Sequence, residues 1–115
     1  MERTNTFLAQ EQELRIYNGQ AIIDLPFQFV YDDAYSTAFE FRGYVSAFMY
    51  VYDERSGQLI KRYTTQVTRN SNYLVLNCSV SDTTFEDNGK YYYEIGFVMS
   101  GGYSITLRYG TLTVI

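Results

Sequence analysis

The residues from Asp87 to Met99, DNGKYYYEIGFVM in one-letter code, constrain the fold more than any other stretch. The segment begins with turn-forming residues and continues as an alternation of side chains, which is the pattern of a β-strand buried on one face. One face carries Tyr91, Tyr93, Ile95, Phe97 and Met99, and the other carries Lys90, Tyr92, Glu94 and Val98. We expect the first set to face the core of the protein.

The same period of two recurs along most of the chain, and no segment has the period of a helix. The expected strands lie at 13–17, 21–31, 44–53, 58–68, 73–80, 90–99 and 103–109, with a short apolar segment at 112–114. With 115 residues, 18 % aromatic side chains and one proline, the chain has the size and composition of one β-rich domain around one core. The sequence therefore predicts an all-β fold, a two-sheet sandwich of seven or eight antiparallel strands.

Alternation also predicts which side chains are buried in the other strands. The expected core positions are Ala21, Ile23, Leu25, Phe27, Phe29 and Tyr31, then Val45, Ala47, Met49 and Val51, then Leu74, Leu76, Cys78 and Val80, and finally Tyr103, Ile105, Leu107 and Tyr109. After Gly110 the apolar positions change from odd to even, at Leu112 and Val114. We expect a β-bulge at Gly110 to cause this change, or else a separate short strand.

Three local signals bear on how the strands connect. Asn18-Gly19 is a strong two-residue turn signal and predicts a hairpin between the strands at 13–17 and 21–31. Pro26 has no N–H to donate, so it predicts a sheet edge or a bulge. The polar segment 58–68 has the character of an edge strand.

The same pattern divides the chain into an arm at residues 1–12, loose or docked on a partner, and a β-sandwich domain at residues 13–115. The first residues contain no apolar signal-peptide segment, so we expect the protein to remain in the cytosol. No apolar run approaches the length of a membrane span, so we expect no membrane partner. The single cysteine, Cys78, cannot form an intrachain disulfide, and we expect a buried, inert thiol.

Composition argues against an enzyme. The chain has no histidine, so neither a Ser-His nor a Cys-His nucleophile can form, and we expect no cofactor and no zinc or copper site. The acidic pairs Asp32-Asp33 and Glu86-Asp87 have the chemistry to ligate calcium or to act as a glycosidase acid and base. Both pairs lie in turn-rich segments, however, where carboxylates usually stabilise local backbone. The net charge of −4 provides no basic patch for nucleic acid.

The outward face of the central strands is more aromatic than a solvated sheet requires. If the strand at 44–53 lies beside the strand at 90–99, this face groups Phe48, Tyr50, Tyr52, Tyr92 and Val98, with Arg108 on the following strand. Tyrosine and arginine are enriched in protein interfaces, so the group is a candidate interface with a subunit or partner. Two alternatives are coverage by the segment 32–43 and a platform for binding sugars.

The turn before the strand at 90–99 has a more specific pattern. Asp87, Gly89 and Tyr91 form an Asp-x-Gly-x-Tyr motif that resembles the tyrosine corner of immunoglobulin-like sandwiches. In that structure the phenol bonds a backbone group a few residues upstream. The resemblance implies a structural role for these three residues and an immunoglobulin-like form of the sandwich.

Longer stretches extend this resemblance over about residues 15–115. The runs NGQAIIDLPFQF, FRGYVSAFMYVYD, DNGKYYYEIGFV and GTLTVI are similar to small immunoglobulin-like domains of tailed-phage virion proteins, such as the N-terminal domain of upper baseplate proteins and modules of phage heads and fibres. Tyr93 stands where antibody domains have their second disulfide cysteine, which argues against an antibody or receptor role.

This family resemblance implies a non-enzymatic structural component of a bacteriophage virion, assembled in the host cytoplasm. It would act in capsid decoration, in a head fibre or in tail or baseplate attachment. The implied partners are other virion proteins, with the chain as a homo-oligomer or bound to a lattice. The alternative is a carbohydrate-binding module that recognises a host glycan.

Overall fold

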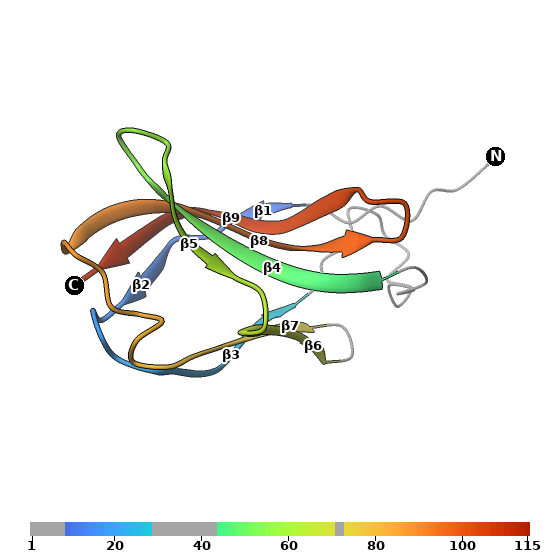
Figure 1. Ribbon diagram of the computed structural model, residues 1–115, viewed down its shortest axis with the longest axis horizontal. Helices are drawn as coiled ribbons and strands as arrows, with labels where there is room; N and C mark the ends of the chain where they lie inside the picture. Colours follow the sequence, from blue (N-terminus) through green and yellow to red (C-terminus); the bar gives the residue numbers. More distant parts are fainter. Residues whose placement is uncertain (1–8, 29–43, 71–72) are drawn as a thin grey trace.

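The computed structural model describes residues 9–28, 44–70 and 73–115 (Figure 1). These residues form nine β-strands in two sheets, and they contain no helix. The two sheets form two layers that face each other (Figure 1). The prediction of an all-β fold with two sheets is confirmed.

The larger sheet has the order β1-β9-β8-β4-β5, and β2 also pairs with β9. Its strands are β1 (Gln10–Glu11), β2 (Leu14–Ile16), β4 (Tyr44–Asp53), β5 (Leu59–Tyr63), β8 (Gly89–Met99) and β9 (Ser104–Val114). Strands β4, β5, β8 and β9 pair antiparallel, as expected, whereas β1 and β2 both run parallel to β9. The expectation of antiparallel strands throughout is therefore wrong for these two short strands.

The smaller sheet has the order β3-β7-β6, and all of its pairs are antiparallel. Its strands are β3 (Ile22–Gln28), β6 (Val67–Asn70) and β7 (Tyr73–Cys78). Pro26 lies in β3, an outer strand of this sheet, as its missing N–H predicts. The segment at 58–68, expected to form one edge strand, instead divides between two strands. Strand β5 lies at an edge of the larger sheet and β6 lies at an edge of the smaller sheet.

The core lies between the sheets. Tyr93, Ile95 and Phe97 of β8 have no exposed surface, as the alternation predicts, and Tyr91 and Met99 pack against the same cluster from partly buried positions. The smaller sheet contributes Phe27, Leu74, Leu76 and Cys78. Burying a large apolar side chain stabilises a fold by about 1.5 to 3 kcal/mol, so this cluster holds the two layers together.

The expected hairpin at Asn18-Gly19 is wrong, although a turn is present. The Gln20 N–H bonds the Tyr17 carbonyl at 3.1 Å, but β2 pairs with β9 and β3 pairs with β7, so the chain crosses from one sheet to the other here. The Asn18 side chain binds the backbone of Phe85, accepting from its N–H at 2.8 Å and donating to its carbonyl at 2.9 Å. The turn is therefore fixed by a distant loop and not by a strand partner.

Two expected core positions are exposed because the strands bulge. Ile23 is 79 % exposed, since the register of β3 against β7 shifts between Ile22 and Leu25, where Asp24 has a positive φ of 51°. Ile22 packs against the core in its place, while Leu25 and Phe27 keep their expected face. Phe29 and Tyr31 lie outside the described residues.

In β4 the register shifts between Tyr44 and Ser46, so Val45 is 61 % exposed and Tyr44 packs against the core. Ala47, Met49 and Val51 are buried, as expected. Three further expected core residues, Ala21, Val80 and Tyr103, are exposed because they lie just outside β3, β7 and β9.

The bulge predicted at Gly110 occurs earlier in β9. Ile95 pairs with Arg108 but Gly96 pairs with Thr106, so Leu107 is the extra residue. A Cβ on Gly96 would lie 2.0 Å from the Ile105 carbonyl oxygen, which shows how closely the two strands approach at the bulge. One consequence is that Tyr109 pairs with Glu94 and faces outward, against the prediction.

The sheet includes part of the segment expected to be an arm. Gln10 and Glu11 pair with β9, and the Gln12 N–H bonds the Tyr109 carbonyl at 2.9 Å. Residues 10–12 therefore belong to the β-domain, which the sequence predicts to begin at residue 13. Residues 1–8 lie outside the described part of the chain.

Candidate binding face

The hydrogen bond that the sequence pattern predicts for the Tyr91 hydroxyl is present. The Tyr91 hydroxyl donates a 2.6 Å hydrogen bond to the backbone carbonyl of Asp87, four residues upstream. Gly89 has a φ of 141°, which a residue with a side chain rarely adopts, and the Tyr91 ring lies 4.9 Å from that of Phe85. Asp87, Gly89 and Tyr91 therefore fix the start of β8.

Two further tyrosines use their hydroxyls inside the fold, which the sequence pattern did not indicate. Tyr93 donates to the carbonyl of Gln12, and Tyr63 donates to the carbonyl of Asp82. Burial raises the pKa of both phenols well above the usual value of 10.0. Both remain protonated donors at neutral pH, so they stabilise the fold.

The outward side of β4, β8 and β9 gathers most of the predicted interface residues. We call this surface the aromatic face and define it by Phe48, Tyr50, Tyr52, Tyr92, Glu94 and Tyr109. Tyr52 pairs with Tyr92 in register, while Glu94 has Tyr50 on one side and Tyr109 on the other. Directly opposed residues on one face have Cβ atoms about 5 Å apart, so these side chains contact one another.

Contacts within the aromatic face are specific. The Tyr52 and Tyr92 rings are 6.2 Å apart between centroids, and the Tyr52 hydroxyl donates a 3.0 Å hydrogen bond to Glu94 Oε1. The Phe48 ring stacks on that of Tyr50 at 4.7 Å, and Arg62 of β5 lies over the Tyr50 ring at 5.6 Å. The face thus consists of rings held in place by their neighbours.

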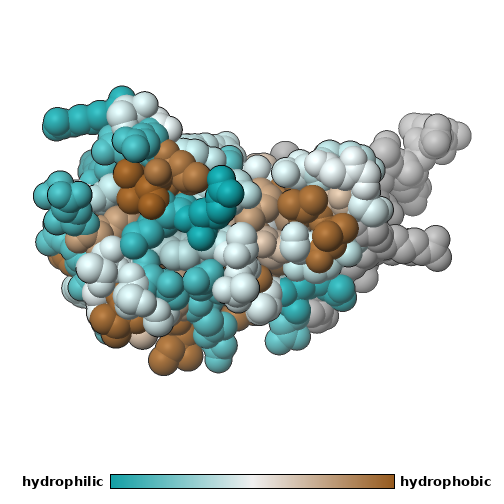
Figure 2. Space-filling model, in the orientation of Figure 1, coloured by the Kyte–Doolittle hydropathy of each residue, from teal (hydrophilic) through white to brown (hydrophobic). Residues whose placement is uncertain are grey.

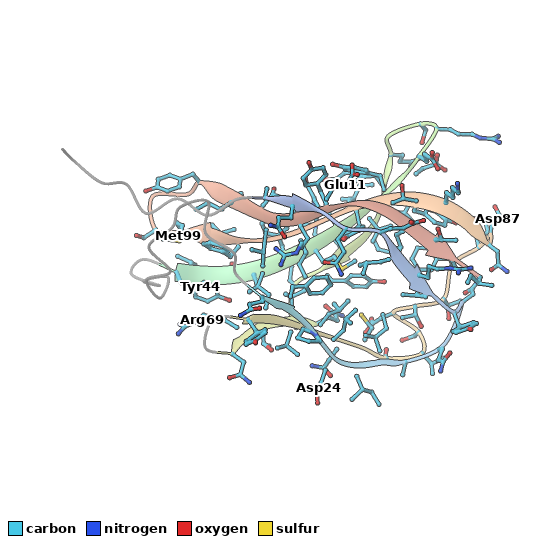
Figure 3. The ribbon with its side chains drawn as sticks, turned by 180° about the vertical axis from the view of Figure 1, so that it is seen from behind. Glu11, Asp24, Tyr44, Arg69, Asp87 and Met99 are labelled. Carbon is cyan, nitrogen blue, oxygen red and sulfur yellow. The ribbon has the colours of Figure 1, made fainter. Side chains whose placement is uncertain are left out.

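Burial, followed by the hydrogen bond to Glu94, raises the pKa of Tyr52 to about 12. Burial also raises the pKa of Tyr92, with smaller contributions from the negative charges of Glu94 and Glu11. Both phenols are therefore neutral at physiological pH. Glu11 lies on the side of the larger sheet that is turned away from the smaller sheet (Figure 3).

A shallow hollow of about 440 Å³ opens at one end of the aromatic face. Its lining residues are Tyr52, Asp53, Glu54, Gly57, Tyr92 and Glu94. Asp53 accepts hydrogen bonds from the backbone N–H groups of Arg55 and Ser56, which lower the pKa of its carboxyl and fix the turn after β4. The hollow therefore combines two ring faces with a negatively charged rim.

The predicted interface residues do not all belong to this surface. Tyr50 and Tyr52 are partly buried and Tyr92 is 40 % exposed, whereas Phe48 is only 4 % exposed and contributes mainly by supporting Tyr50. Val98 pairs with Ser46 towards the other end of β8, away from the hollow. The exposed part of the face therefore consists mainly of tyrosine.

The structure separates Arg108 from the others. Its side chain is 7 % exposed, and one guanidinium nitrogen donates a 2.6 Å hydrogen bond to the carbonyl of Gln28 in β3. Because the bulge at Leu107 changes the phase of β9, Arg108 points towards the smaller sheet. The expectation that Arg108 joins the aromatic face is wrong.

Sequence reasoning missed two members of the aromatic face. Alternation places Glu94 on the outward side of its strand, together with Tyr92, but a carboxylate is not a typical interface residue, so the predicted group does not include it. Alternation places Tyr109 in the core, because the change in apolar positions predicts the bulge at Gly110, after Tyr109, whereas the bulge lies at Leu107, before it.

Other candidate chemistry finds little support among the residues described. They include no group of three or more potential metal-ligating side chains, and they include no helix long and apolar enough to span a membrane. Cys78 is buried, which raises the pKa of its thiol to about 12. Asp32-Asp33 lies outside the described residues, as does the segment 32–43, whose coverage of the face is one of the two alternatives to an interface.

The fold and this face together define a two-sheet all-β protein with an outward surface of tyrosines around a carboxylate. In the space-filling view, apolar residues form small patches separated by polar ones (Figure 2). Comparison of the sequence with protein-family models and with curated proteins finds no match.

Proposed function

We propose that the protein is a non-enzymatic attachment domain that binds another protein through the aromatic face. The observation that carries this proposal is that Tyr52 pairs with Tyr92 and bonds Glu94 on the outward side of the larger sheet. These side chains face away from the core between the sheets. Tyrosines held in position lose little conformational entropy on binding, and they are enriched where proteins meet.

An immunoglobulin-like form of the sandwich is part of this proposal, and the strand order supports it. In that fold, one sheet contains strands B, E and D, and the other contains G, F and C with C′ added in variable-type domains. The orders β3-β7-β6 and β9-β8-β4-β5 correspond to these sets. The tyrosine corner lies at the start of β8, the strand that corresponds to F.

We assign the attachment role to a tailed-phage virion, as a capsid-decoration, head-fibre or baseplate component. This assignment rests on the resemblance of the strand and turn sequences to phage immunoglobulin-like domains. The aromatic face supplies a surface through which such a domain would join another virion protein or a second copy of itself.

The proposal is tested by purifying phage particles that carry the tagged full chain and by measuring the mass of the isolated protein with light scattering. We expect the chain to remain with the particles, and Tyr92→Ser to reduce its incorporation. Tyr73→Ser is the matched control, because Tyr73 is 36 % exposed on the outward side of β7 in the smaller sheet. A strictly monomeric chain absent from particles would contradict the proposal.

A carbohydrate-binding module is the second candidate, because the hollow places Tyr52 and Tyr92 beside a carboxylate that can accept hydrogen bonds from hydroxyl groups. Aromatic rings of this kind stack on sugar faces. A glycan array tests it: binding that disappears in Tyr52→Ala and Tyr92→Ala would support the module, and an array without signal would reject it.

A further inference from the structure

Glu94 has an unusual environment for a carboxylate. It is half-buried in the middle of β8, and Tyr50 and Tyr109 lie on either side of it in the sheet. Its carboxylate accepts one hydrogen bond, from the Tyr52 hydroxyl, and no cation of the described residues forms an ion pair with it. The nearest cation in its row of the sheet, Arg62, lies over the Tyr50 ring. A carboxylate with one hydrogen bond and no cation keeps acceptor capacity for a binding partner, because its two oxygens can accept about four hydrogen bonds.

The side chains around Glu94 favour positive charge. Tyr52, Tyr92 and Tyr109 surround it, and the faces of aromatic rings attract cations. Glu11 adds a second negative charge near Tyr92, and Asp53 and Glu54 add two more at the rim of the hollow. The part of the face around Glu94 therefore suits a positively charged group better than an anion such as phosphate.

We propose that the aromatic face binds a basic segment of its protein partner, with an arginine side chain of that segment paired to Glu94 and flanked by Tyr52 and Tyr92. A guanidinium fits because it is planar: it binds a carboxylate with two parallel hydrogen bonds and stacks on aromatic rings, which an ammonium group does less well. The net charge of −4 on the whole chain favours the approach of such a segment. This inference rests on the proposed attachment role and specifies the chemistry of the partner.

The test uses the full ¹⁵N-labelled chain and two short peptides of glycine and serine, one with arginines and the other with neutral citrulline at the same positions. We expect saturable chemical-shift changes at Tyr52, Tyr92 and Glu94 with the arginine peptide only. Glu94→Gln should raise Kd at least about tenfold, because it removes the charge and keeps the shape. Glu86→Gln, in the exposed loop before β8, is the charge-matched control and should leave Kd unchanged. Equal binding of both peptides, or equal effects of both substitutions, would overturn the inference.

Glu94→Gln in the particle assay separates this inference from the attachment role itself. If Tyr92→Ser reduces incorporation into particles but Glu94→Gln does not, the face binds a protein without using the carboxylate, and only the inference fails. If neither substitution reduces incorporation, the attachment role through this face fails as well. Reduced incorporation of both variants, together with arginine-dependent peptide binding, supports both.

Discussion

The Tyr93 hydroxyl donates a 2.6 Å hydrogen bond to the backbone carbonyl of Gln12, one of the two residues that link β1 to β2. Gly110 of β9 makes this contact sterically possible. Gly110 pairs with Tyr93 in register, and a Cβ on it would lie 2.8 Å from the same carbonyl oxygen. The phenol therefore joins the middle of the larger sheet to the short parallel strands at its edge.

Removing this hydroxyl should destabilise the protein measurably. We expect Tyr93→Phe to lower the free energy of unfolding by about 1 to 3 kcal/mol, because the Gln12 carbonyl loses a partner at a buried position. Urea denaturation followed by fluorescence measures the change. Tyr92→Phe is the control from the adjacent position, and it should stay within about 0.5 kcal/mol of the parent because its ring faces outward.

Tyr91 provides an intermediate case. Its hydroxyl also bonds a backbone carbonyl, that of Asp87, but its ring is only partly buried. We expect Tyr91→Phe to cost about 1 kcal/mol, less than Tyr93→Phe and more than Tyr92→Phe. The same denaturation series tests the order, and equal losses for Tyr91→Phe and Tyr92→Phe would show that the corner contributes nothing to stability.

The alternation of side chains predicted much of this fold because burial on one face repeats every two residues wherever a strand is regular. It identified the inner faces of β7 and β8, and it placed Tyr50, Tyr52 and Tyr92 on one surface. It failed at Ile23, Val45 and Tyr109, where a bulge shifts the phase of the strand. The change of apolar positions after Gly110 does indicate a bulge in β9, but the bulge lies at Leu107, where β8 and β9 approach closely, and alternation alone does not give that position.

Strand partners were less predictable than strand faces. A turn signal such as Asn18-Gly19 reports local backbone geometry, whereas pairing depends on which distant strand offers free N–H and C=O groups. Here β2 pairs with β9 in parallel, and the Ile115 N–H extends this pairing by donating a hydrogen bond to the carbonyl of Ile16. The N–H of Asn18 in turn bonds the Ile115 carbonyl. The chain therefore leaves the larger sheet at a site that resembles a hairpin in sequence alone.

Arg108 gives a further test of stability. The Arg108 guanidinium, on β9 of the larger sheet, donates a hydrogen bond to the Gln28 carbonyl of β3 in the smaller sheet. Burial lowers the pKa of Arg108. We expect Arg108→Met, which keeps the apolar stem, to lower the free energy of unfolding by about 1 to 2 kcal/mol through loss of this hydrogen bond. Arg62→Met, on the exposed side of β5, is the matched control. A loss of similar size in both variants would show that the cross-sheet bond is not the cause.

The buried phenols make stability sensitive to alkaline pH. Tyr52, Tyr63 and Tyr93 all have a pKa raised above the ordinary value of 10.0, mainly by burial. A raised folded-state pKa means that the unfolded chain loses its proton first, so the contribution to stability is complete below pH 10 and decreases as pH rises above it. We expect the melting temperature to fall between pH 10 and 12, and less steeply in Tyr93→Phe than in the parent, measured relative to each protein's own value at pH 8. An identical slope in the variant would contradict the role of Tyr93.

Adding a single methyl group at Gly96 should lower the free energy of unfolding substantially. A Cβ there would lie 2.0 Å from the Ile105 oxygen and 2.9 Å from the Ile105 carbonyl carbon, and both are backbone atoms that cannot rotate away. We expect Gly96→Ala to cost about 3 kcal/mol, because β8 and β9 must separate at the bulge to admit one methyl group. Denaturation and the amide chemical shifts of residues 104–109 measure the loss and locate it.

The control for this substitution is Gly57→Asn in the turn between β4 and β5. Gly57 has a positive φ of 72°, a Cβ added to it would have no neighbouring atom within 4 Å, and asparagine tolerates this backbone conformation. It should therefore cost well under about 1 kcal/mol. If Gly96→Ala is as mild as this control, the two strands can separate freely at Leu107. The bulge that turns Tyr109 towards Glu94 would then be a flexible feature, and the aromatic face would have to form on binding instead of being held ready by the sheet.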